Sequence, residues 1–208
     1  MHARRDEREC PLPGDEILPD VEGSLTHAVT IARPRAAVWP WLVQMGAWRA
    51  GWYSYDFIDN ERHHSEERIV PELQEIDVGT VMPWLPGATE GFSVMRVERP
   101  RCIVLGAVPP EGGPPPMTWA FVLEEPRPGT TRLIARARAR AGYKPPFGLP
   151  RWTLKTVVPW GHLIMQRKQL LGIARRAEAM EYGASESGTR DAGSGRREAR
   201  TTTGPALR

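Results

Sequence analysis

The residues best suited to carry chemistry lie in one aromatic segment, residues 48–60. It combines large rings with carboxylates, and its main candidates are Trp48, Trp52, Tyr53, Tyr55 and Asp56. A carboxyl group beside aromatic rings can have a raised pKa, so Asp56 is a candidate general acid or base. On a helix, Asp59 would share its face. Alternatively, Asp56 braces the helix by holding Arg49 or a backbone amide.

A long amphipathic helix, predicted over residues 151–182, places a second set of polar candidates. Its apolar side is marked by residues at helical spacing, Leu163, Leu170, Ala174 and Ala177. Gln166 falls within this apolar side, and His162 lies on its edge one turn earlier. Either the backbone and water satisfy this pair, or the two side chains face a ligand cavity. His162 is therefore the second catalytic candidate.

The elements that must position these residues are mostly short strands. Residues 25–31 read as a strand, Pro34 begins a short helix, and the aromatic segment 52–60 predicts a second one. Further strands are predicted at 80–85, 91–98, 102–108, 117–125 and 131–141. Tight turns between them favour an antiparallel meander. Trp84 and Trp119 fall within two of these strands.

The last predicted strand alternates arginine with alanine. Successive side chains of a strand point to opposite faces, so Arg136, Arg138 and Arg140 share one face of the sheet and the alanines share the other. One interpretation places the arginines on a solvated convex face with alanine inside. The other points the arginines into a cavity as an anion site.

Composition indicates one globular domain. The chain has 208 residues, of which 40% are apolar and 25% charged. Both ends are poor in bulky apolar residues, so we predict disordered tails at 1–23 and 183–208 around a folded domain at 24–182. The sequence shows no stretch for a membrane span and no secretory signal. Two cysteines imply no disulfide framework and fit a cytoplasmic location.

Several functional classes are disfavoured. His63 and His64 lack metal-ligand spacing, so we expect no metal. The sequence has no phosphate-binding loop, dinucleotide fingerprint or nucleophile elbow, and we expect no cofactor. The basic residues are nearly all arginine, but the net charge is only +3. We therefore expect no nucleic-acid partner.

The segments 26–46, 49–60, 68–74, 118–121 and 165–172 resemble the START-like helix-grip superfamily (SRPBCC), in particular a bacterial subgroup related to polyketide cyclases and dehydrases. The resemblance covers about residues 24–180. It implies an α+β helix-grip fold: a curved antiparallel sheet of six or seven strands around the long C-terminal helix, with two short helices after the first strand. Such a fold leaves a cavity between the sheet and the helix.

Three functions follow from this expectation. The first is binding of an apolar or amphipathic small molecule, lipid-like or polyketide-like, in that cavity. Its expected ligand-binding residues are Trp48, Trp52, Tyr53, Tyr55, Trp84, Trp119, His162 and Gln166. The second is an enzyme of cyclase or dehydratase type acting in the same cavity. The third is a protein-interaction module without a usable cavity.

Overall fold

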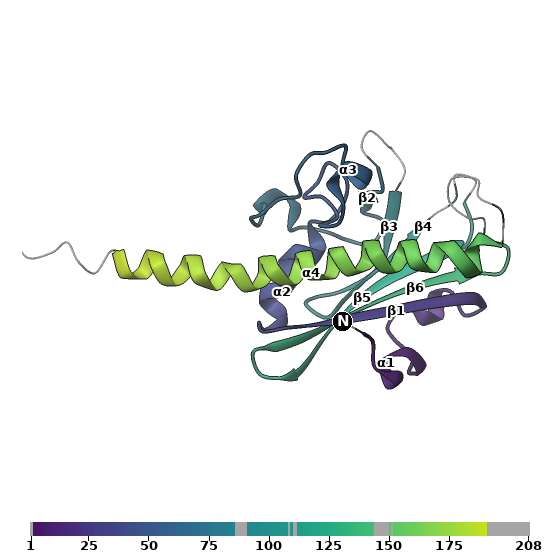
Figure 1. The fold of residues 1–208 in the computed structure, drawn as a ribbon, viewed down its shortest axis with the longest axis horizontal. Helices are drawn as coiled ribbons and strands as arrows, with labels where there is room; N and C mark the ends of the chain where they lie inside the picture. The colour runs from purple at the N-terminus through teal and green to yellow at the C-terminus, as the bar shows by residue number, and fades with distance from the viewer. Residues whose placement is uncertain are drawn as a thin grey trace, which may run out of the picture.

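The computed structural model describes residues 2–85, 91–107, 109, 112–143, 150 and 152–190, with side chains described up to residue 180 in the last segment. Its framework is one six-stranded antiparallel sheet with strand order β1-β6-β5-β4-β3-β2 (Figure 1). The strands are β1 (Val21–Ile31), β2 (Val81–Pro83), β3 (Gly91–Glu98), β4 (Cys102–Ala107), β5 (Met117–Arg127) and β6 (Thr130–Arg140). Each predicted strand is present, and the predicted antiparallel meander is confirmed from β2 to β6.

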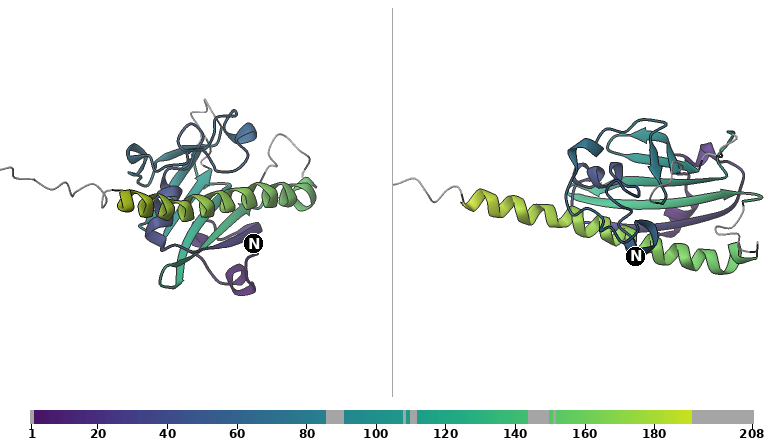
Figure 2. Two further views of the ribbon diagram at one scale, coloured as in Figure 1. Left: turned by 60° about the vertical axis from the view of Figure 1, so that its left-hand side comes forward. Right: turned by 90° about the horizontal axis from the view of Figure 1, so that it is seen from above.

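The helices are α1 (Arg5–Glu9), α2 (Arg35–Val43), α3 (Asp56–Asp59) and α4 (Thr153–Arg190), with short 3-10 turns at Asp15–Ile17 and Pro71–Leu73. Helix α4 crosses one face of the sheet and extends past its edge (Figure 2). Two short helices follow the first strand, as predicted, although the second covers only Asp56–Asp59 of the predicted range 52–60. The arrangement is the expected helix-grip fold. Among the described residues, none of the helices combines the length and apolar character needed to cross a bilayer.

The main core fills the space between the sheet and helices α2 and α4. Leu133 and Ala135 of β6 belong to it, as do Leu170 and Ile173 of α4. Ala137 lines a cavity next to α4, so the alanine side of β6 faces the helix, as predicted. Small side chains at these positions leave room beneath the N-terminal half of α4.

The arginine side of β6 faces away from α4, but it is not the solvated surface that we expected. Residues 2–20, here called the N-terminal strap, lie across it, and the Arg136 side chain is only 4% exposed. Glu7 pairs with Arg132, and Asp15 pairs with Arg136 and Arg138. The alternative of an anion-binding cavity is not supported at Arg136 and Arg138 either, because Asp15 pairs with both, whereas Arg140 at the end of the strand is exposed as expected.

The tail predictions differ from the structure in two ways. Residues 1–23 were expected to be disordered, yet Ala3, Leu12 and Leu18 of the strap are buried against the sheet. The segment has too few apolar residues to be held by hydrophobic burial alone, which is why its composition predicted disorder. Its ion pairs with β6 provide additional attraction. At the other end, α4 continues to Arg190, beyond the predicted boundary at 182. Residues 191–208 of the predicted C-terminal tail lie outside the described residues.

Candidate functional site

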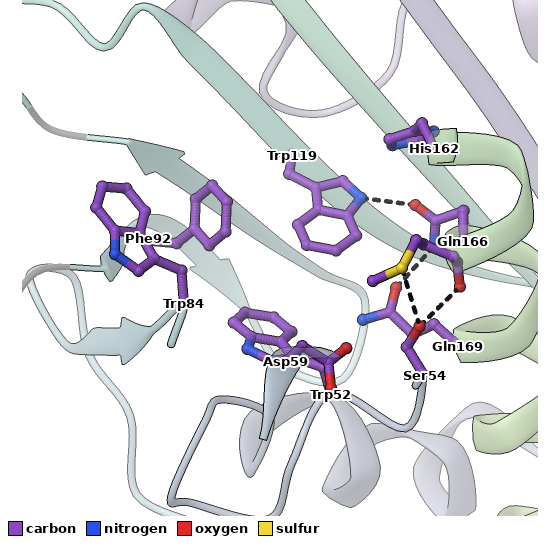
Figure 3. Close-up of a pocket in the computed structure, with 10 residues that line it drawn as sticks. Trp52, Ser54, Asp59, Trp84, Phe92, Trp119, His162, Gln166 and Gln169 are labelled. Atoms are coloured by element: carbon purple, nitrogen blue, oxygen red, sulfur yellow. Dashed lines mark hydrogen bonds between the residues drawn. The ribbon is translucent and has the colours of Figure 1, made fainter. Parts of the chain in front are cut away.

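A cavity of about 160 Å³ lies between the sheet, α3 and α4. Its wall consists of Trp52, Ser54, Asp59, Trp84, Phe92, Trp119, His162, Met165, Gln166 and Gln169 (Figure 3). We call it the aromatic pocket. In the sequence these residues form four separate groups: the 52–59 segment, the end of β2 with β3, the start of β5, and α4. The helix-grip topology brings them together.

The four rings of the aromatic pocket contact one another. Trp52 stacks on Trp119 with ring centroids 5.6 Å apart, and Phe92 meets both of these rings edge to face. Trp84 meets Phe92 perpendicularly at 5.9 Å. The indole N–H of Trp52 donates to the Pro83 carbonyl, so its polar edge is satisfied by the backbone. The rings therefore present mainly apolar faces and edges to the cavity.

A chain of hydrogen bonds holds the α4 side of the pocket. Trp119 Nε1 donates to Gln166 Oε1 at 2.9 Å, and Gln166 Nε2 donates to Gln169 Oε1 at 2.7 Å. Gln169 Nε2 in turn contacts the sulfur of Met45. Gln166 and Gln169 are both 2% exposed, so their partners offset the cost of burying two amides. Gln166 thus combines both predicted roles, since it is paired within the protein and faces the cavity.

His162 stands at the end of this wall with an unusual environment for a histidine. It stacks on His27 of β1, with centroids 5.4 Å apart, and its Nδ1 is buried with no hydrogen-bond partner among the described residues. Burial, and secondarily the neighbouring His27, lower the pKa of His162 to about 4. The imidazole is therefore neutral near pH 7 and has one nitrogen available as an acceptor.

Asp59 is the acid of the aromatic pocket. The residue is 7% exposed, and its Oδ1 is buried without a hydrogen-bond partner among the described residues. Burial is the main reason that the pKa of Asp59 is raised to about 6, and the nearby Asp56 carboxylate raises it further. A group with this pKa can exchange a proton near neutral pH.

The structure does not bring Asp56 and His162 together. The Asp56 carboxylate accepts hydrogen bonds from the hydroxyl and the backbone N–H of Ser65, which is the bracing role of the alternative interpretation. It lines a different groove, formed with residues of α4 such as Arg175 and Arg176. The pair of ionisable groups in the aromatic pocket is therefore Asp59 and His162.

Five of the eight predicted ligand-binding residues line the pocket, namely Trp52, Trp84, Trp119, His162 and Gln166. The other three lie elsewhere. Trp48 is 61% exposed, and Tyr55 contacts Phe57 outside the pocket wall. Tyr53 is buried below the Arg176 guanidinium, which lies 4.7 Å from its ring centre.

Sequence reasoning missed Ser54, Phe92, Met165 and Gln169 as pocket residues. Gln169 carried a usable signal, because it follows Gln166 by three residues and therefore shares its face of α4. The sequence placed Phe92 in a strand but did not show which way its side chain points. That direction is set by the pairing of β3 with β4. Nothing local distinguished Ser54 or Met165.

Acid unfolding tests the ionisation of the pocket. Histidine in an unfolded chain has a pKa near 6.5, whereas the pKa of His162 in the folded chain is about 4. Between these pH values the unfolded chain binds more protons at residue 162 than the folded chain does. This contribution therefore lowers the stability of the fold as the pH falls. Asp59 acts oppositely between about pH 4 and 6, where the folded chain holds the extra proton. We predict that Asp59→Asn loses stability more steeply on acidification than the parent, by up to about 1 kcal/mol per pH unit after solvent screening.

Urea unfolding at pH 4.5, 5.5 and 6.5 measures this difference. His162→Gln is the matched variant, and it should show the reverse change because only the Asp59 contribution remains. Identical pH slopes for the parent and Asp59→Asn would contradict the assigned environment of Asp59.

A second cavity, of about 230 Å³, begins on the other side of His162. It lies between the alanine side of β6 and the first turns of α4, and Leu25, Met117, Leu154 and Val158 are among its apolar lining residues. His162 lines both cavities. The two cavities therefore meet at His162, whose ring stacks on that of His27.

Comparison with known proteins gives only distant structural matches. No family model matches the chain, and a search of curated protein sequences gave no significant match. Among solved structures, a polyketide cyclase-like protein from Corynebacterium glutamicum shares 14% identity at a TM-score of 0.37, over 78% of this chain and 94% of that one. A protein from Arthrobacter aurescens shares 15% identity at a TM-score of 0.42, over 75% and 86% of the two chains.

Norcoclaurine synthase from Thalictrum flavum shares 12% identity at a TM-score of 0.41, over 84% of this chain and 95% of that one. These distant matches carry no argument about the fold, which follows from the element order and the sheet topology of the chain itself. At these identities and TM-scores no residue role transfers to this chain. The properties of the pocket must be argued from its own side chains.

Proposed function

We propose that this protein binds a small, largely apolar organic molecule with a polar end in the aromatic pocket. The supporting observation is the pocket itself: four aromatic rings surround a cavity of about 160 Å³, with polar side chains concentrated on the α4 side. Apolar protein cavities of roughly 150 Å³ hold molecules the size of benzene. A one-ring ligand therefore matches the volume, and the adjoining cavity beyond His162 provides room for a longer substituent.

The unpaired polar groups of the pocket wall determine which of these molecules it favours. Asp59 Oδ1 is an acceptor without a partner among the described residues, and the neutral His162 ring has one acceptor nitrogen and an unpaired Nδ1. The Gln166 and Gln169 amides are already paired. A ligand that donates hydrogen bonds, through a hydroxyl or an amine, satisfies these acceptors. A purely aliphatic lipid would leave them unpaired, so the pocket favours an amphipathic aromatic molecule.

Binding is tested first with indole and p-cresol as probes, using isothermal titration calorimetry on the full chain. We predict that Trp84→Ala weakens binding of these probes by about 10-fold, because the mutation removes one ring of the wall. Trp160→Ala is the matched control, since Trp160 lies on α4 but is 68% exposed. Equal affinities for the parent and both variants would exclude the aromatic pocket as the binding site.

Native mass spectrometry of the protein purified from cells complements the probes. A mass adduct that is present in the parent and depleted in Trp84→Ala identifies the natural ligand. The interaction-module hypothesis predicts no such adduct, because it requires no usable cavity.

An acid–base enzyme acting in the same pocket is the second candidate, because Asp59 and His162 both line it. Near neutral pH, His162 is neutral and Asp59 is mainly ionised, so each can accept a proton from a bound substrate. The test is turnover of the co-purified molecule. An enzyme loses at least 100-fold in kcat on Asp59→Asn or His162→Gln, whereas a carrier returns the molecule unchanged.

A further inference from the structure

The aromatic pocket has an unusual charge content for this protein. Asp59 is its one acidic lining residue, and neither lysine nor arginine occurs among the ten lining residues that the structure describes. The chain as a whole carries 28 basic residues. A buried carboxylate in a basic protein ordinarily finds a cationic partner, as Glu7 finds Arg132. Asp59 has no such partner among the described residues.

A buried carboxylate without a counter-charge is costly, because burial removes water, and hydrogen bonds from the backbone of Tyr55 and Asp59 offset that loss only in part. The chain nevertheless keeps Asp59 at 7% exposure with Oδ1 unsatisfied. A bound positive charge would remove this cost directly. It would also donate the hydrogen bond that Oδ1 lacks, provided that it carries an N–H group.

The rest of the pocket suits a cation as well. Aromatic faces attract a positive charge through their quadrupoles, and tryptophan is the most effective ring for this interaction. Trp52 and Trp119 stack on one another at 5.6 Å, and Asp59 lies with Trp52 below the Trp119 ring in the view of Figure 3. His162, across the pocket, is neutral near pH 7 and does not repel a cation.

We infer that the ligand of the aromatic pocket is an organic cation, a protonated amine that places its ammonium group beside Asp59 and the tryptophan rings. This inference rests on the proposed function and specifies its ligand class. The ammonium N–H donates to Asp59 Oδ1, and the apolar part of the ligand packs against Trp84 and Phe92. No bond is made or broken.

The probes are benzylamine, which is protonated at pH 7.5, and benzyl alcohol, which has the same shape and a neutral donor. Their dissociation constants are measured by calorimetry on the full chain. We expect benzylammonium to bind at least 10-fold more tightly than benzyl alcohol. In Asp59→Asn the two affinities should agree within about 2-fold, whereas the control Asp77→Asn, which removes an exposed carboxylate, should retain the preference.

The outcomes separate this inference from the proposed function. Equal binding of both probes to the parent, or a cation preference that survives in Asp59→Asn, would overturn the cation inference while leaving pocket binding intact. Binding of neither probe would overturn both.

A measurement on the parent keeps the test valid if Asp59→Asn fails to fold. Asp56 on its own helix is the charged group that acts on Asp59, and His162 is the other titratable side chain that lines the pocket. As the pH falls from 7 to 5, Asp59 becomes protonated and His162 stays neutral, so the preference for benzylammonium should fall at least 5-fold. A preference that is independent of pH over this range contradicts the inference.

Discussion

Replacing Glu7 with glutamine is expected to lower the free energy of unfolding by about 3 kcal/mol. The Glu7 carboxylate receives two hydrogen bonds from Arg132, from Nε at 2.6 Å and from Nη2 at 2.8 Å. The two side chains are 6% and 11% exposed, so the pair is screened little by water. Without the carboxylate, the Arg132 guanidinium keeps its contacts with Thr30 and His2 but loses its counter-charge.

Glu9→Gln provides the control within the same helix. Glu9 pairs with Arg5 on the surface, where the side chains are 62% and 83% exposed, and exposed pairs contribute little. We expect its midpoint of urea unfolding to stay close to that of the parent. A double variant, Glu7→Gln with Arg132→Met, should lose less stability than the two single changes summed. A loss below about 1 kcal/mol for Glu7→Gln would show that the Glu7–Arg132 pair contributes little to the fold.

Acid should weaken the same contact. Burial raises the pKa of Glu7, but hydrogen bonds from Arg132 and from the Arg4 amide outweigh it, and the net pKa lies below the ordinary value. The stabilisation is therefore complete at neutral pH and is lost as the pH falls through the folded-state pKa of Glu7.

Gly172→Ala is the second change with a large expected effect. A Cβ at this position of α4 would lie 2.5 Å from the carbonyl oxygen of Tyr53 and 3.1 Å from its Cβ. Alanine ordinarily stabilises a helix interior by about 1 kcal/mol over glycine, but here the backbone of the 52–54 segment must move away. We predict a net loss of about 1–3 kcal/mol, together with weaker probe binding, because Trp52 and Ser54 on that segment line the pocket.

Gly161→Ala tests the same substitution in the same helix without the contact. Gly161 is exposed, and nothing lies within 4 Å of the position that its Cβ would take. This variant should be more stable than the parent by about 0.5–1 kcal/mol. Urea unfolding of both variants measures the opposite signs. A stabilised Gly172→Ala would contradict the close approach of the 52–54 segment to α4.

Much of the fold could be predicted because its signals are local. Alternation of β-branched and polar residues marked the strands, and helical spacing of leucine and alanine marked α4. The alanines of β6 correctly indicated the side that faces the helix. Aromatic residues in the 48–60 segment and in two strands indicated an aromatic cavity, and Trp52, Trp84 and Trp119 do line it.

Local sequence signals could not show which of two aspartates, Asp56 or Asp59, is the acid of the pocket. Asp56 and Asp59 lie three residues apart in one short helical turn, and composition gives them equivalent surroundings. Only the packing of residues 60–65 against this turn distinguishes them. Ser65 donates a hydrogen bond to the Asp56 carboxylate, whereas Asp59 lines the pocket. Similarly, the strap looked disordered because its partners lie more than 100 residues away on β6.

The sequence by itself determined the strands of the sheet, the long helix α4, their order along the chain and the aromatic character of the region between sheet and helix. These properties depend on neighbours within a few residues, where periodicity and turn chemistry act. The tertiary structure decided which charges meet: Glu7 with Arg132, Asp15 with Arg136, and Asp59 with no cation among the described residues. The physical reason is that pairing and desolvation depend on distances between groups far apart in the chain, which local patterns do not specify.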